Sequence, residues 1–161
     1  MGAPGSLAIA AAMFLLLAAG VAGIIYYAYP WLSASYSATS NLTRYLENLS
    51  RSQGYNYTVQ QIQSIMRQEA YVAMAVSAMS MAVGALAWLY AYRPDVRGDL
   101  RRAASSSLYL GVLSIILAFG AVGFFLVFAG SLLSAALLIG AWLRIRPHLR
   151  RSEALASVAT P

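Results

Sequence analysis

Long stretches of apolar residues without any charge dominate the chain. One extends from Leu7 to Tyr29 and another from Ala70 to Tyr92. A third, from Ala103 to Leu143, is about twice as long as the roughly 20 residues that a helix needs to cross a membrane. It therefore predicts two helices, with the turn between them near Gly120 and Gly123. The pattern predicts an all-α integral membrane protein, a bundle of four transmembrane helices over 7–29, 70–92, 104–121 and 124–144.

Two prolines mark the expected ends of spans. Proline lacks an amide donor and restricts the residue before it, so Pro94 is expected to end the second span at Tyr92. The charged residues 93–102 then form a short loop. Pro147 is expected to end the fourth span, which leaves 145–161 as a tail that is disordered from Ser152 onward.

The segment 30–69 lies between the first two spans and carries two helical patterns. Thr58 and Gln61 have the spacing of a capping box, which predicts the start of a helix. Apolar residues recur at helical spacing at Leu42, Tyr45, Leu46 and Leu49, and again at Val59, Ile62, Ile65 and Met66. We expect a short extramembrane helical hairpin with its turn at 52–56, and a loop with one short helix is the alternative.

Small residues follow the second span at separations that alternate between three and four. They are Ala70, Ala73, Ser77, Ser80, Gly84, Ala87 and Ala91. This spacing keeps them on one face, and small side chains let helices approach closely in lipid, so the face is a predicted helix-packing seam. The first span offers a partner surface at Ala8, Ala12, Leu15, Ala19 and Ala22. The two spans are expected to pack antiparallel. The seam serves packing within one chain or, alternatively, assembly of subunits.

Composition supports a membrane protein, because 60% of the residues are hydrophobic and only 10% are charged, against roughly 25% in a typical soluble domain. All basic residues are arginines. Most of them lie in 93–102 and after Leu143, which four spans place on the same side. The positive-inside rule makes that side cytoplasmic, so both termini are expected in the cytoplasm and 30–69 outside a cell membrane.

The arginines on this expected cytoplasmic face are predicted to contact anionic lipids or an acidic partner. They are Arg97, Arg101, Arg102, Arg144, Arg146, Arg150 and Arg151. Nucleic acid is not expected as a partner, because the charges follow long apolar segments instead of forming a basic face of a soluble domain.

All asparagines of the chain lie in the expected exterior segment, and each one begins a glycosylation sequon. Asn41 is followed by Thr43, Asn48 by Ser50, and Asn56 by Thr58, each two positions on. The three asparagines are therefore predicted glycosylation sites in a host that has the machinery.

Groups that carry chemistry are scarce in the sequence. There is no cysteine, His148 is the single histidine, and Asp and Glu together number 5. Apart from Arg144 at the very end of the fourth predicted span, no Asp, Glu, Arg, Lys or His lies within a predicted span, whereas proton relays and ion-coupled carriers normally need such a group inside the membrane. The sequence therefore predicts no catalytic residue, no cofactor site and no metal site, and we do not expect an enzyme.

These features favour a non-catalytic membrane subunit or scaffold. It is expected to assemble through its small-residue helix faces, with membrane lipids and other membrane subunits or a second copy of itself as partners, and to present the exterior helical hairpin. The alternative is a homo-oligomeric channel or pore whose water path is lined by serine and tyrosine faces.

Overall fold

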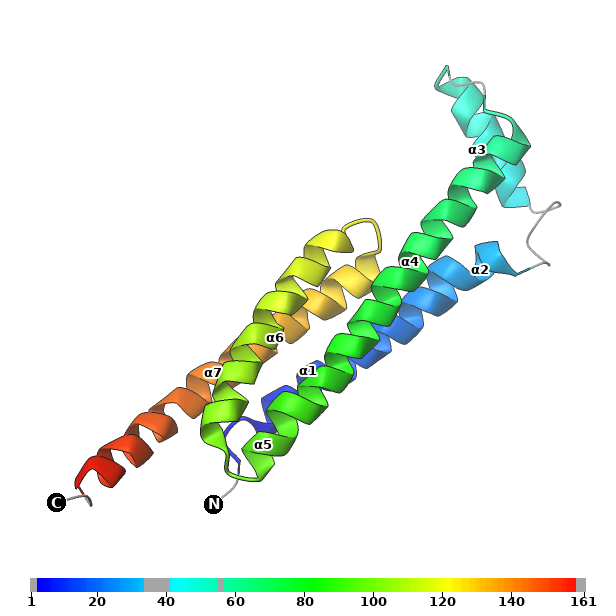
Figure 1. Ribbon diagram of the computed structural model, residues 1–161. Helices are drawn as coiled ribbons and strands as arrows, with labels where there is room; N and C mark the ends of the chain where they lie inside the picture. Colours follow the sequence, from blue (N-terminus) through cyan, green and yellow to red (C-terminus); the bar gives the residue numbers. More distant parts are fainter. Residues whose placement is uncertain (1–2, 34–40, 55–56, 159–161) are drawn as a thin grey trace.

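The computed structural model describes residues 3–33, 41–54 and 57–158, and it is all helical with no strand over these residues (Figure 1). Four of its helices are long and apolar enough to cross a membrane. The predicted all-α architecture with four apolar helices is therefore confirmed. The reason is local: each helix contains a long window with few or no charges, and only a helix satisfies its own backbone in lipid.

The first two long helices each contain a π-helical turn followed by a proline. The first, Ser6–Leu32, consists of α1 (Ser6–Gly23), η1 (Ile24–Ala28) and α2 (Tyr29–Leu32). The second, Val59–Val96, consists of α4 (Val59–Ala87), η3 (Trp88–Tyr92) and α5 (Arg93–Val96). Pro30 and Pro94 lie in the first turns of α2 and α5. The wider turn before each proline lets the helix continue without the missing amide donor.

Both predicted proline stops are therefore wrong as helix ends. The second helix continues past Pro94 to Val96, and Gly98, with a φ of 81°, makes the turn into α6 (Leu100–Gly120). The fourth helix, α7 (Phe125–Val158), contains Pro147 in its interior, so the described part of the predicted disordered tail is helical. A single proline removes one hydrogen bond, and the leucines, arginines and alanines around Pro147 are strong helix formers.

The four long helices form an antiparallel bundle in which α1 lies between α4 and α7 (Figure 1). α6 packs closely on α7 and more lightly on α4. The start of α1, the α5–α6 connection and the C-terminal part of α7 lie at the same end of the bundle, here called the terminal end (Figure 1). At the other end α4 extends beyond α6 and α7 and carries α3 (Asn41–Ser52).

The core of the bundle repeats every 3.5 residues on all four helices. Its buried positions are Ile9, Ala12, Leu16, Ala19 and Gly23 on α1; Ala70, Ala73, Ser77, Ser80, Gly84, Ala87 and Ala91 on the second helix; Ala103, Ser107, Leu110, Ser114 and Leu117 on α6; and Val127, Ser131, Ser134, Leu138, Ala141 and Ile145 on α7. This is the spacing of a left-handed coiled coil. The packed face of α1 differs from the predicted partner surface at two positions. Leu15 and Ala22 are only partly buried, whereas the next residues, Leu16 and Gly23, are buried.

The capping box at the start of α4 is confirmed. The Thr58 amide donates to Gln61 Oε1 at 2.9 Å, and the Gln61 amide donates to Thr58 Oγ1 at 3.3 Å. Beside this helix start, apolar side chains of α3 and α4 line one shared hollow of about 400 Å³, among them Leu46, Leu49, Ile62, Ile65 and Met66. The apolar stripes of the two helices therefore face a common space.

Candidate functional site

The predicted seam on α4 is covered by α1 of the same chain. A Cβ added at Gly20 would lie 2.5 Å from Met81 Cγ and 2.7 Å from the Ser77 carbonyl oxygen, so the backbones of α1 and α4 approach too closely for any larger residue. Gly84 allows a similar approach from the other side, where a Cβ would lie 3.3 Å from Leu16 Cβ. These small residues thus serve packing within the chain, and this face of α4 is not open to another subunit.

Two serines bind the backbone of α1 from opposite sides. Ser80 Oγ on α4 donates to the Leu16 carbonyl at 2.8 Å. Ser134 Oγ on α7 lies 3.0 Å from the Ala12 carbonyl and 2.7 Å from the Gly130 carbonyl of its own helix. Interhelical hydrogen bonds in membrane proteins contribute about 0.6 kcal/mol on average. α1 therefore lies between two helices that each bind its backbone through a serine. The small side chain of serine also permits close packing.

The other serines of the core are also fully buried within the single chain. Ser107 and Ser114 donate to carbonyls one turn earlier in α6. The hydroxyls of Ser77 and Ser131 have no hydrogen-bond partner among the described residues. None of these serines faces the outside of the bundle, so they do not form an outward serine face of the kind expected for an oligomeric pore.

A buried carboxylate at the terminal end was missed by the sequence analysis. Asp95 was placed in a solvated loop, but it lies in the last turn of the second helix with 1% of its surface exposed. The Gly5 amide donates to Asp95 Oδ2 at 3.0 Å, and Oδ1 has no partner among the described residues. No pattern pointed to it, because Asp95 lies among arginines whose charges are exposed. Asp95 lies beyond the predicted span 70–92, in the part of the helix that continues past the expected proline stop.

A cavity of about 370 Å³ adjoins this carboxylate and also contacts Pro4, Leu100 and His148. Asp95 and His148 are the two side chains there with metal-ligand chemistry. Within the described ranges no three Asp, Glu or His side chains gather as a metal site would require. The cavity therefore offers one acidic and one imidazole group.

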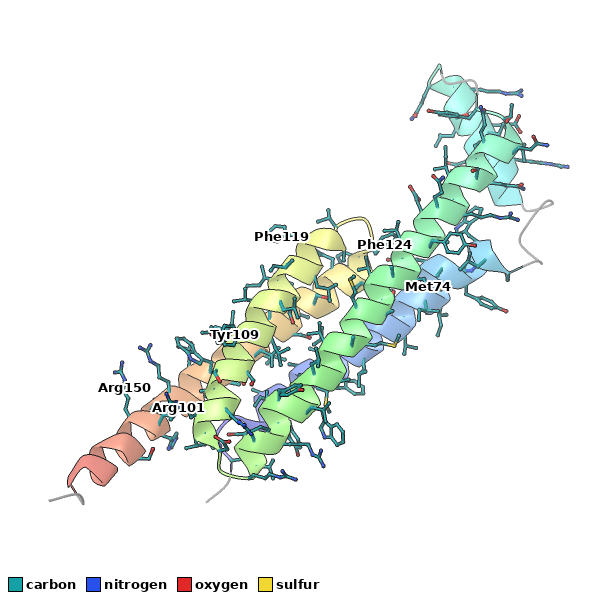
Figure 2. All side chains as sticks on the ribbon, in the orientation of Figure 1. Met74, Arg101, Tyr109, Phe119, Phe124 and Arg150 are labelled. Carbon is teal, nitrogen blue, oxygen red and sulfur yellow. The ribbon has the colours of Figure 1, made fainter. Side chains whose placement is uncertain are left out.

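All the arginines predicted to contact lipid or a partner are exposed, and Figure 2 shows two of them, Arg101 and Arg150, at the terminal end. Arg97, Arg101 and Arg102 lie around the α5–α6 connection, whereas Arg144, Arg146, Arg150 and Arg151 lie on α7. Two arginines stack on tryptophans: Arg93 lies 4.9 Å from the centre of the Trp88 ring, and Arg146 lies 5.1 Å from that of Trp142. Such cation–π pairs hold guanidinium groups beside apolar surface.

Of the three asparagines in sequons, Asn48 is exposed on α3. The side chain of Asn41 and the whole of Asn56 lie outside the described residues. Comparisons with protein-family models, with curated proteins and with solved structures gave no match to this chain.

Proposed function

We propose that this protein is a non-catalytic integral membrane subunit or scaffold, which lies in the cell membrane with both termini in the cytoplasm and presents the segment 30–69, with α3 and the start of α4, outside. The arginines at the terminal end support this orientation through the positive-inside rule. A core of apolar residues and serines that is buried within the single chain supports a structural role.

One observation carries the assembly part of the proposal. A second stripe of small residues runs along α4 at separations of three and four, and unlike the buried seam it is exposed: Ala75, Ala78, Ala82 and Ala85. Large apolar side chains surround it, including the exposed Tyr71 and Leu89. A small-residue face in lipid allows another helix to approach closely, and close packing is the main attraction available there. Lateral association therefore uses this exposed alanine stripe in place of the covered seam.

The test is the native mass of the particle purified in mild detergent, with any chain that copurifies identified. Ala78→Leu and Ala85→Leu are expected to reduce association, because each leucine holds the partner helix away. Ala136→Leu is the matched control, since Ala136 is an exposed alanine on α7. If all three variants retain the wild-type mass, or if the wild type is a monomer that binds no other chain, the proposal is wrong.

The pore alternative has less support, because the serines of the helix core are buried within one chain. It would be favoured if purification yielded a symmetric ring of identical subunits that conducts ions in liposomes. Glycosylation of Asn41, Asn48 and Asn56 also stays a proposal, and the exposure of Asn48 agrees with it.

A further inference from the structure

We propose that the groove between α4 and α6 binds a phospholipid with an anionic headgroup, a binding site that goes beyond the proposed subunit role. The headgroup phosphate lies in a cavity of about 360 Å³ at the terminal end, the arginine pocket, whose polar lining is Tyr90, Arg93, Arg97, Asp99, Arg102 and Ser106. One acyl chain continues into a second, apolar hollow between the same two helices.

The charge of the arginine pocket matches a phosphate. Three guanidinium groups face it against one carboxylate, that of Asp99. Asp99 is also engaged locally, since it accepts from the Arg102 amide at 3.2 Å as the cap of α6 and lies 3.8 Å from Arg102 Nε. The pocket thus keeps an excess of positive charge. Arginine presents paired donors that fit the oxygens of a phosphate, and the hydroxyls of Tyr90 and Ser106 add two further donors.

The arginine pocket lies at the depth where a headgroup would be. Arg93 stacks on Trp88, which is 44% exposed, and tryptophan is enriched where membrane meets water. Tyr90 is 58% exposed beside it. A site for a soluble anion does not need such aromatic side chains, whereas a site for a lipid headgroup lies at the interface where they are enriched.

The second hollow lies between the same two helices, farther from the terminal end, and reaches Gly120 at the end of α6. It has a volume of about 450 Å³ and is lined by apolar side chains, among them Val76, Met79, Val83, Leu113, Ile116 and Leu117. On α6, Ser106 of the arginine pocket and Leu117 of this hollow are separated by about 16 Å at the helical rise, and their spacing places them on one face. The hydrocarbon core of a bilayer is roughly 30 Å thick, and one acyl chain spans about half of it. The separation between Ser106 and Leu117 is close to that length.

The groove between α4 and α6 exists because α6 packs more closely on α7 than on α4. At Gly111 a Cβ would lie 2.9 Å from Ile139 Cγ1, so α6 and α7 are in close contact. Gly120 lines the hollow between α6 and α4, and a Cβ there would meet no atom of the described residues within 4 Å. The core of the bundle is therefore complete without this space, and the space opens on the outer surface where lipid has access.

The test measures lipid binding to the full-length protein in detergent by native mass spectrometry and by the shift in melting temperature. The probes are long-chain phosphatidylglycerol, long-chain phosphatidylcholine, short-chain phosphatidylglycerol and inorganic phosphate. Long-chain phosphatidylglycerol is expected to bind at least about tenfold more tightly than phosphatidylcholine. The Arg97→Gln/Arg102→Gln double variant is expected to lose that preference. Arg150→Gln/Arg151→Gln, with the same change of charge on α7, is the matched control and keeps it.

A second variant tests the acyl part. Leu113→Trp fills the apolar hollow without changing the charge, so it is expected to weaken long-chain phosphatidylglycerol about tenfold and to leave inorganic phosphate unchanged. Equal binding of the two long-chain lipids, or equal loss in both arginine double variants, overturns the proposal. Inorganic phosphate that binds as tightly as the long-chain lipid would show a free-phosphate site and would equally overturn it.

Discussion

The amide of Gly5 and the carboxylate of Asp95 form a hydrogen bond of 3.0 Å between residues 90 positions apart in the sequence. It joins the start of α1 to the last turn of the second helix. Gly5 also lies against α7, where a Cβ would be 2.7 Å from Ile145 Cδ1. Gly5 therefore contacts two other helices at the terminal end, one through this hydrogen bond and the other through Ile145.

Replacing Asp95 by alanine is expected to lower the free energy of unfolding by about 1–3 kcal/mol, because the Gly5 amide loses a buried charged acceptor. Asp95→Asn keeps an acceptor oxygen at nearly the same place, so its loss is expected to be smaller. The measurement is the melting temperature in a fixed detergent. If both variants have the melting temperature of the wild type, the contact contributes nothing to stability.

The close approach of α1 and α4 predicts opposite effects for two glycines in helix interiors. Gly20→Ala places a Cβ 2.7 Å from the Ser77 carbonyl oxygen, so the helices must separate and we expect a loss of about 1–3 kcal/mol. Gly140→Ala is the control, since a Cβ there meets nothing within 4 Å and alanine favours the helix by up to about 1 kcal/mol. Denaturant unfolding in mixed micelles compares them. Equal stability of the two variants would contradict the close contact between α1 and α4 at Gly20.

Two buried serines one turn apart on α4 are expected to respond differently to alanine. Ser80→Ala removes a hydrogen bond to the Leu16 carbonyl and is expected to cost about 0.6 kcal/mol, and at most about 1.7. Ser77→Ala removes a hydroxyl that has no partner among the described residues, so it is expected to be neutral or slightly stabilising. The same unfolding assay measures both. A larger loss for Ser77→Ala than for Ser80→Ala would contradict this assignment of the bonds.

The orientation in the membrane is tested by single cysteines, because the chain has none of its own. Arg97→Cys and Asn48→Cys introduce thiols at exposed positions near opposite ends of the molecule. An impermeant maleimide added to intact cells is expected to label position 48 alone, and position 97 is expected to react after the membrane is opened. Labelling of both positions from the same side would rule out the proposed topology.

Local features of the sequence determined a large part of the fold. Four apolar helices follow from uncharged stretches of membrane length, since helix formation in lipid depends on the residues of the segment itself. The start of α4 follows from Thr58 and Gln61, which satisfy each other's backbone within one turn. The small-residue stripe that was singled out as a packing seam, which includes Ser77 and Ser80, is buried.

Only the tertiary structure decided which neighbour each face meets. α4 carries two small-residue stripes of similar spacing, and α1 covers Ser77 and Ser80 while Ala78 and Ala82 stay exposed. Asp95 is buried because the Gly5 segment folds over it, a contact between distant residues that no local pattern encodes. Spacing determines which residues share a helix face, but the burial of that face depends on the shape of the helix that packs against it.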